Sequence, residues 1–288
     1  MSDGIAKALK SLGLEPIRVV DVGASDLGPT GDRPPYEGLE AQGLMRLTGF
    51  EPNAAEFEKL AQTETKTYLP YAVGDGGEAT LYITRSHGFT STLRPNPPVL
   101  GQLHNFGRAA SVAREVTMQT RALDDIAEIP AIDFFKIDIQ GGELNAMRGG
   151  RAKLADALCI HTEVAFVKLY EDQPLFPDQD RYLQESGFEL FAFHSMNGAA
   201  HSAGLRIMTR PQRRREFRQI VDGDAVYFPA RDRIDELSDA QVLKLLAIAL
   251  LSYNALSFGL HLLDILAARG IDCAVLRDLV LNDGAPAA

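Results

Sequence analysis

The stretch IRVVDVGASDLGPTG, residues 17–31, joins a short apolar run to a loop that begins with a glycine. Valine and isoleucine dominate residues 17–22, which favours a buried strand of a parallel sheet. In open α/β sheets a ligand binds beyond the carboxyl ends of the strands, where the strand order reverses. Gly23 falls at this point, and because it has no Cβ the backbone there can approach a ligand closely. The stretch therefore predicts the first strand of an α/β sheet and a ligand-binding loop after it.

The rest of the chain alternates between runs typical of strands and runs typical of helices, which indicates a parallel sheet with helical crossovers. Four more apolar runs are candidate parallel strands, at residues 44–50, 67–73, 133–139 and 158–164. Helices are expected near the start of the chain and at residues 53–62, 142–154 and 178–186. Period-two alternation predicts an antiparallel flap outside the main sheet, at residues 78–86 and 114–123. Two further strands are expected late in the chain, at residues 187–195 and 223–230.

The composition is that of a globular protein with one large domain and an extension: 288 residues, 45% hydrophobic and 24% charged. The net charge of −10 argues against nucleic acid as the main partner, because phosphate binding needs a basic surface. The exception is the run RPQRRREFR, residues 210–218, which is either a solvated face or a clamp for an anionic part of a substrate. Cys159 and Cys273 lack metal-ligand spacing, so we expect both to be buried.

We expect a ligand-binding domain over residues 1–232 and a helical extension over residues 233–288. Residues 85–114, between the flap strands, form a long connection rich in Gly, Pro, Asn and Ser, which predicts a lid or substrate loop; the alternative is an insertion without a role at the site.

In the extension, Lys244 interrupts the most apolar run, which favours packed helices or a homodimer contact over a membrane span. Ser238 suits the N-cap of this helical segment, and Gly270 suits its C-terminal stop. The N-terminus lacks the apolar core of a signal peptide, so the expected location is cytoplasmic.

Two acidic residues at consecutive strand ends narrow the class of ligand. Asp21 precedes Gly23, and Glu51 ends the second predicted strand just before Pro52. A dinucleotide site would need the pattern G-x-G-x-x-G, whereas residues 21–28 read D-V-G-A-S-D-L-G. Asp21 would repel a pyrophosphate but could accept hydrogen bonds from an ammonium group, and Glu51 could grip both hydroxyls of a ribose. The pattern favours S-adenosylmethionine over a dinucleotide; the alternative is that both acids cap turns or helices.

Several segments resemble, in order and spacing, the FkbM family of S-adenosylmethionine-dependent O-methyltransferases. They are VVDVGASDLG, GFEPNAAEFEKL, YAVGDGGEATLYIT, TRALDDI and FFKIDIQGGELNAMRGG followed by IHTEVAFVKLYEDQPLF, within residues 17–230. The most specific is KIDIQGGEL, where Gln140 stands at a position that is Glu or Gln in the family. The resemblance implies the class I methyltransferase fold, a Rossmann-like α/β sheet of seven mostly parallel strands, one of them antiparallel, flanked by helices.

The resemblance also implies which residues hold S-adenosyl-L-methionine and its product S-adenosyl-L-homocysteine. The loop at residues 21–24 would face the methionine end, Glu51 the ribose, and the turn at residues 73–75 the adenine. The expected cofactor-binding residues are Asp21, Gly23, Ala24, Glu51, Pro52, Asn53, Val73, Asp75, Ser91, Asp138 and Gln140. Ser91 and Thr92 resemble a family pair that either orients cofactor and acceptor or caps a turn.

Methyl transfer to a hydroxyl depends mainly on alignment, and a base that removes the hydroxyl proton adds about 10²–10⁴-fold. The expected catalytic candidates are Asp138, Glu163, His87 and His194. Lys136 either keeps Asp138 ionised or pairs with another acid. Glu143 either caps the following helix or reaches into the crevice. Asp138, Glu143 and Glu163 could together also bind a divalent cation, but no metal is expected, because the chain lacks a tight His/Asp ligand set.

The sequence therefore predicts transfer of a methyl group from S-adenosylmethionine to a hydroxyl of a small molecule, such as a sugar-containing compound, a polyketide or another natural product. The two alternatives are an NAD-dependent oxidoreductase and a non-catalytic nucleoside-binding scaffold that assembles through its apolar tail.

Overall fold

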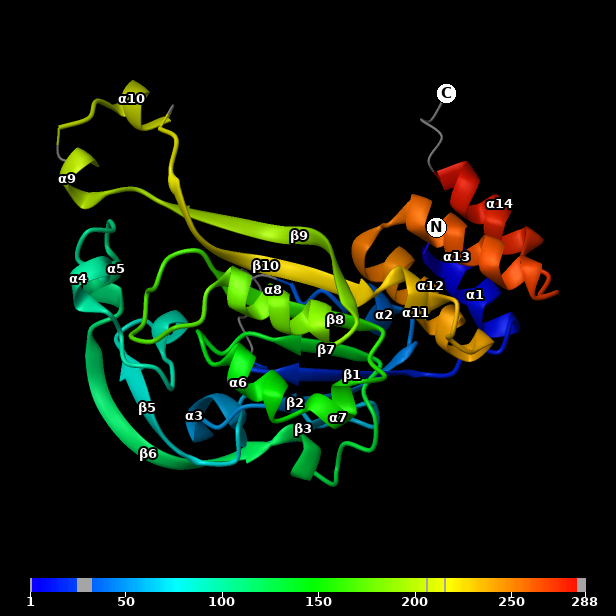
Figure 1. The fold of residues 1–288 in the computed structure, drawn as a ribbon, viewed down its shortest axis with the longest axis horizontal. Helices are drawn as coiled ribbons and strands as arrows, with labels where there is room; N and C mark the ends of the chain where they lie inside the picture. The colour runs from blue at the N-terminus through cyan, green and yellow to red at the C-terminus, as the bar shows by residue number, and fades with distance from the viewer. Residues whose placement is uncertain (1, 25–32, 206, 215, 284–288) are drawn as a thin grey trace.

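The computed structural model describes residues 2–24, 33–205, 207–214 and 216–283, and within them the chain builds a seven-stranded sheet (Figure 1). Its strand order is β3-β2-β1-β7-β8-β10-β9. The strands are β1 (Ile17–Val22), β2 (Met45–Phe50), β3 (Lys66–Leu69), β7 (Phe134–Ile137), β8 (Cys159–Ala165), β9 (Phe188–Ala199) and β10 (Gln219–Pro229). The pairs from β3 to β8 are parallel, whereas β10 is antiparallel to β8 and β9. This arrangement confirms the expected class I methyltransferase sheet.

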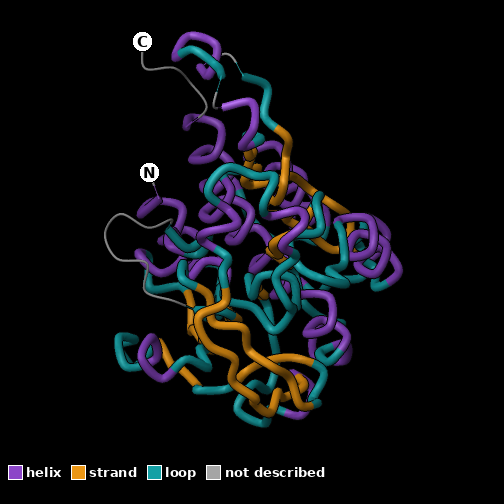
Figure 2. Tube along the Cα trace, turned by 90° about the vertical axis from the view of Figure 1, so that its left-hand side faces the viewer, coloured by secondary structure: helices purple, strands orange, loops and turns teal. Residues whose placement is uncertain are grey.

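Alternate residues of each strand point to opposite faces, and each face has its own core. Ile17 and Val19 pack with α1 (Ser2–Ser11), α2 (Glu37–Ala41) and the C-terminal helices. Val20 and Val22 pack with α6 (Glu143–Arg148), α7 (Arg151–Leu154) and α8 (Phe176–Glu185). Helices therefore lie on both sides of the sheet (Figure 1, Figure 2). Asp21 alternates in step with Ile17 and Val19, so it faces the side of the C-terminal helices.

Two predicted elements are divided in the structure, one at a proline and one at a glycine. The strand expected at residues 67–73 is two strands, β3 and β4 (Ala72–Gly74), because Pro70 has no N–H for the ladder. The helix expected at residues 142–154 is divided into α6 and α7 at Gly149, where a Cβ would lie 2.4 Å from a backbone oxygen of Gly74. The helix expected at residues 53–62 is the single turn α3 (Ala54–Phe57).

The antiparallel flap is confirmed. Strands β5 (Glu78–Thr84) and β6 (Val112–Ala122) pair antiparallel, and β4 joins β6 to make a separate three-stranded sheet. The predicted lid between them contains η1 (His87–Phe89), α4 (Pro97–Leu100) and α5 (Phe106–Ala109), and η2 (Leu123–Asp125) follows β6. An isolated β-bridge between Leu103 and His201 joins this lid to the connection between β9 and β10.

The extension is helical, as expected. It consists of α11 (Arg231–Ile234), α12 (Asp239–Tyr253), α13 (Leu256–Ala268) and α14 (Ala274–Asp283), which share a core with β1 and β2. Ser238 caps α12 by accepting a hydrogen bond from the Gln241 N–H, and Gly270 follows α13 with a φ of 87°. The division into two domains and a homodimer contact through these helices stay predictions. Cys159 and Cys273 are buried, as expected.

Helix α12 is buried along most of its length, and this explains its apolar composition. Lys244, the charge inside its apolar run, places Nζ 3.0 Å from Asp133 Oδ2. Arg18 donates two side-chain hydrogen bonds to the same carboxylate, at 2.9 and 2.6 Å. Across the described ranges, no helix is long and apolar enough to cross a membrane.

Candidate active site

A cavity of about 1520 Å³ opens at the carboxyl ends of β1, β2, β7 and β8. Strand order reverses between β1 and β7, which is where open α/β sheets bind their ligands. Pockets for a single small molecule usually measure about 300–1,000 Å³, so this cavity has room for a cofactor and an acceptor together.

Gly23 lines the cavity, although the structure gives a different reason for the glycine from the one expected. Its φ is 86°, and a Cβ at this position would lie 2.1 Å from the backbone oxygen of Asp138. The glycine therefore allows the loop after β1 to touch the loop after β7. Ala24 is buried, donates its N–H to Phe50 O at 3.0 Å, and is not among the residues that line the cavity.

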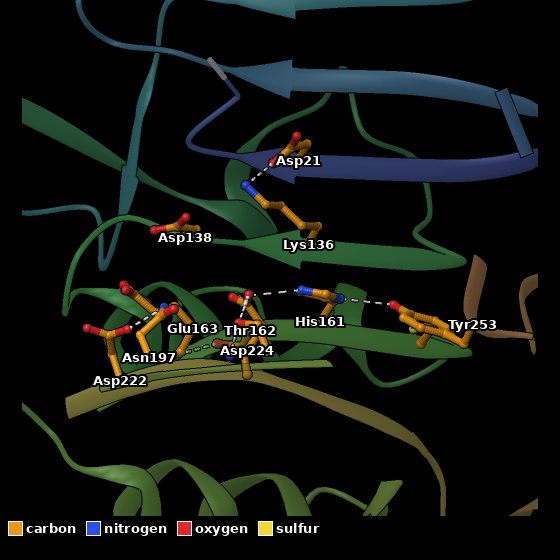
Figure 3. A network of polar contacts seen from close by, with 12 residues as sticks. Asp21, Lys136, Asp138, His161, Thr162, Glu163, Asn197, Asp222, Asp224 and Tyr253 are labelled. Atoms are coloured by element: carbon orange, nitrogen blue, oxygen red, sulfur yellow. Dashed lines mark hydrogen bonds and ion pairs between the residues drawn. The ribbon is translucent and has the colours of Figure 1, made fainter. Parts of the chain in front are cut away.

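Asp21 is buried at the cavity wall with partners for both carboxylate oxygens. The Tyr36 hydroxyl donates to Oδ2 at 2.7 Å, and Lys136 Nζ lies 3.1 Å from Oδ1 (Figure 3). Burial acts to lower the pKa of Lys136, but the charges of Asp21 and Asp138 raise it above its ordinary value. Lys136 thus pairs with another acid, the second of the two expected alternatives, and Asp21 is anchored by the chain itself.

Glu51 is 5% exposed at the end of β2 and lines the cavity. Its Oε1 accepts a hydrogen bond from the Asn53 N–H at 2.7 Å. Burial raises the pKa of Glu51 above its ordinary value. Pro52 and Asn53 also line the cavity, and it is the Asn53 side chain that caps α3, by accepting from Ala55 N at 3.1 Å. Glu51 therefore accepts a hydrogen bond within the turn and also lines the cavity.

The predicted adenine turn is only partly at the cavity. Val73 is buried and lines it, beside apolar side chains such as Phe50, Leu81 and Met118. Asp75 is not among the lining residues, and its carboxylate accepts from Gly77 N at 3.0 Å to close a turn. A contact between Asp75 and the cofactor stays a prediction.

Gln140 joins the two acids expected after β7 and β8. Its Nε2 lies 2.9 Å from Asp138 Oδ1 and 3.1 Å from both oxygens of Glu163, and its φ is 61°. The Tyr170 hydroxyl and Ser91 Oγ hold it in place by bonding its side-chain and backbone oxygens, at 3.1 and 2.6 Å. Burial, followed by the charges of Asp138 and Glu143, raises the pKa of Glu163 well above its ordinary value. Asp138, Gln140, Glu163 and Ser91 all line the cavity.

Glu143 caps the loop before α6. It is 1% exposed, and its Oε1 accepts hydrogen bonds from Ile139 N at 2.9 Å and Gly141 N at 3.0 Å. Oxygens of Asp138, Glu143 and Glu163 lie within 4.8 Å of one another, as a cation site would require. However, N–H groups of the chain already donate to each of the three carboxylates.

The two candidate histidines both line the cavity, from different sides. His87 lies on η1 in the lid, and His194 lies on β9. The His194 ring is 5.2 Å from the ring of His161, and burial together with His161 lowers the pKa of His194.

Sequence reasoning missed several residues at this wall, of which Figure 3 shows His161, Asp224 and Tyr253 together. The cavity is also lined by His161 on β8, Asp224 on β10 and Ser195 on β9. The Tyr253 hydroxyl on α12 forms a hydrogen bond with the His161 ring. One available signal was the spacing of His161, two residues before Glu163 on one face of a strand.

By contrast, the described arginines at 210, 213 and 218 do not line the cavity, and Arg215 lies outside the described residues. Among the side chains that the structure describes, the run 210–218 therefore contributes no arginine to this cavity, and its role as a solvated face or an anion clamp stays a prediction.

Comparison with known structures gives distant matches. A methyltransferase FkbM from Methylobacillus flagellatus KT is 14% identical over 74% of this chain, with a TM-score of 0.37. The match spans 43% of that protein, so less than half of its length is represented here. Magnesium protoporphyrin IX methyltransferase from Synechocystis PCC 6803, solved with bound SAM, is 11% identical over 80% of this chain and 78% of its own, with a TM-score of 0.37. No curated protein matches the chain.

The family comparison is more extensive. The model of the methyltransferase FkbM domain matches residues 21–190, which is more than half of the chain and includes the ends of β1, β2, β7 and β8. This match disfavours the dinucleotide oxidoreductase. The chain belongs to the FkbM methyltransferase domain family.

Proposed function

We propose that this protein transfers the methyl group of S-adenosylmethionine to a hydroxyl oxygen of a sugar-containing or other natural-product acceptor. Membership of the FkbM family implies S-adenosylmethionine as the donor and S-adenosylhomocysteine as the product. The acceptor class rests on the groups that face the cavity.

The observation that carries the proposal is that Glu51, Gly23 and Asp138, from three neighbouring strand ends, line one cavity. The residues present fit a nucleoside. The Glu51 carboxylate gives one oxygen to the Asn53 N–H, which leaves its other oxygen for ribose hydroxyls. Val73 and Leu81 supply an apolar wall for a base.

Bound S-adenosylmethionine supplies a methyl group on a positively charged sulfur, which is electrophilic without further activation. The chain then has to hold a hydroxyl oxygen in line with that group and accept the hydroxyl proton. Asp138, Glu163, His87 and His194 all line the cavity and are the sequence-based candidates for the proton acceptor.

The acceptor is proposed to bind between the lid and the ends of β8, β9 and β10. On the sheet side the cavity presents the hydrogen-bonding groups of Ser195, Asn197 and Asp222. On the lid side it presents Phe89 and Phe106, whose rings pack edge to face with centroids 5.2 Å apart. A wall with many hydrogen-bond acceptors opposite an aromatic wall suits a hydroxylated ring, which has polar edges and apolar faces.

The test uses purified protein, S-adenosylmethionine with a deuterated methyl group, and a small-molecule extract of the cells that make the protein. We expect mass spectrometry to find an extract compound that gains one labelled methyl group, and fragmentation to place it on oxygen. Glu51→Ala should lose the product, whereas Glu58→Ala, an exposed acid on the same segment, should keep it. Tight binding of S-adenosylhomocysteine without any labelled product would favour the non-catalytic scaffold.

A further inference from the structure

A line of polar contacts runs from the C-terminal helices into the cavity (Figure 3). The Tyr253 hydroxyl on α12 lies 3.0 Å from His161 Nδ1 on β8. His161 Nε2 in turn lies 3.8 Å from Asp224 Oδ1 on β10. The Ser195 hydroxyl on β9 donates to Asp224 Oδ2 at 2.6 Å. His161 is buried, whereas the Asp224 side chain is 30% exposed and lines the cavity.

The contact with Tyr253 sets the tautomer of His161. Burial raises the pKa of Tyr253 far above its ordinary value, so the phenol keeps its one proton. Cys159 Sγ, 3.5 Å from this hydroxyl, is the other available acceptor, but the ring nitrogen is nearer and a stronger acceptor. When the hydroxyl donates to Nδ1, the neutral imidazole carries its proton on Nε2, the nitrogen that faces Asp224. The distance of 3.8 Å is longer than a hydrogen bond, and contacts of this kind often shorten when a substrate binds.

Asp224 and Glu163 are cross-strand neighbours with opposite protonation preferences. Burial acts to raise the pKa of Asp224, but the nearby His161 ring and the hydrogen bond from Ser195 outweigh it and lower that pKa below its ordinary value. Burial and nearby acids raise the pKa of Glu163 instead. Neighbouring carboxyls whose pKa values are pushed apart commonly divide acid and base roles between them.

The other charged or titratable groups around Asp224 come from β7, β9 and β10. Lys136 on β7 acts to lower the pKa of Asp224. His194 lies on β9 and Asp222 on β10, and the pKa of His194 is lowered by burial, so it stays neutral near pH 7. Lys136 thus favours the ionised form of Asp224, whereas the neighbouring acid Asp222 opposes it.

We propose that Asp224 accepts the proton of the acceptor hydroxyl, and that His161 and Tyr253 are positioning residues that hold it ready. This inference rests on the proposed methyl transfer. The hydroxyl proton passes to an oxygen of Asp224, and the electron pair of the O–H bond becomes the new O–C bond to the methyl group. The carbon–sulfur bond breaks with its electron pair left on sulfur, and Asp224 then gives its proton to water. The C-terminal helices are therefore part of the catalytic unit.

The first test needs no acceptor. Protein labelled with ¹⁵N-histidine, with and without S-adenosylhomocysteine, should show His161 by NMR as the Nε2–H tautomer. Tyr253→Phe should move it to a mixture of tautomers, whereas Tyr182→Phe, which removes a different tyrosine hydrogen bond on α8, should leave it unchanged. His161 observed as the Nδ1–H tautomer in the wild-type protein would overturn the proposal.

The second test uses the acceptor found by isotope labelling. Asp224→Asn should bind S-adenosylhomocysteine as the wild type does but lose about 10²–10⁴-fold in kcat. Ser195→Ala keeps the carboxylate and removes a donor, so the acidic limb of its pH–rate profile should move to higher pH. Tyr253→Phe should move that limb in the same direction, with KM for the donor unchanged. Wild-type turnover that survives in Asp224→Asn but disappears in Asp138→Asn would assign the proton to Asp138 and overturn the inference. No turnover by the wild type would count against the methyltransferase function itself.

Discussion

Gly23 and the carbonyl group of Asp138 lie in contact, so that a Cβ on the glycine would come within 2.1 Å of the carbonyl oxygen. The loops after β1 and β7 meet there, at the point where the strand order reverses. The close contact between these two loops at the cavity therefore depends on the absence of a side chain at residue 23.

Gly23→Ala should therefore cost both stability and donor binding. An L-residue at positive φ costs about 1–2 kcal/mol, and at residue 23 the clash with backbone adds to this. Gly13→Ala is the matched control, because its φ is 87° and a Cβ there meets nothing within 4 Å. Urea unfolding should show a larger loss for Gly23→Ala, and calorimetry should show weakened S-adenosylhomocysteine binding in that variant alone. Equal losses in the two variants would remove the contact with Asp138 as the reason for the glycine.

Glu51→Ala should weaken binding of S-adenosylhomocysteine about ten-fold or more, because a hydrogen bond to a charged group contributes about 1.5–3 kcal/mol. Burial raises the pKa of Glu51, so its carboxylate becomes protonated at a higher pH than an ordinary glutamate, whose pKa is about 4.3. As pH is lowered, the affinity for S-adenosylhomocysteine should therefore begin to fall before a pH of about 4.3 is reached. Calorimetric titrations across a pH series would measure both effects, with Glu58→Ala as the unaffected control. A Glu51→Ala protein that binds as the wild type does would exclude Glu51 from the donor site.

Asp133→Ala should lower the free energy of unfolding by about 3–5 kcal/mol, because it leaves Lys244 buried without its partner. Burial acts to raise the pKa of Asp133, but hydrogen bonds from Arg18 and Lys244 lower it below its ordinary value. The pairing of Asp133 with Arg18 and Lys244 therefore stabilises the protein fully above the pKa that Asp133 has in the unfolded chain. This stabilisation is lost as pH falls through the lower pKa that Asp133 has in the folded protein. Asp264→Ala, which removes the partner of Arg277 in an exposed pair, should cost about 1 kcal/mol or less. Similar losses in the two variants, measured by urea unfolding at pH 7, would contradict this account.

Glu163→Gln should stabilise the protein at neutral pH. Because burial and nearby acids raise the folded pKa of Glu163 above its unfolded value, the wild type loses stability as pH rises from about 4.3 toward the folded pKa. The variant cannot ionise, so its unfolding free energy should vary less over that range, whereas the exposed Glu185→Gln should follow the wild type. Parallel pH profiles for Glu163→Gln and the wild type would show that Glu163 ionises normally.

Local features of the chain were predicted well because they depend on neighbours in sequence. The apolar period placed β1 at residues 17–22, and Ser238 and Gly270 marked the ends of the C-terminal helical pair. Pro70 was also visible in the sequence, and its missing N–H should have divided the third predicted strand. The resemblance to the FkbM family led to the correct sheet, and the end of the second predicted strand led to Glu51.

By itself, then, the sequence determined the strands, the glycine turn and the acids at the strand ends, since alternation, turn chemistry and strand termination act over a few residues. Only the tertiary structure decided which of these groups have partners. Tyr36 reaches Asp21 across 15 positions, and Tyr253 reaches His161 across 92. Such pairs form because packing brings a helix over a particular face of the sheet, and no local pattern specifies that arrangement.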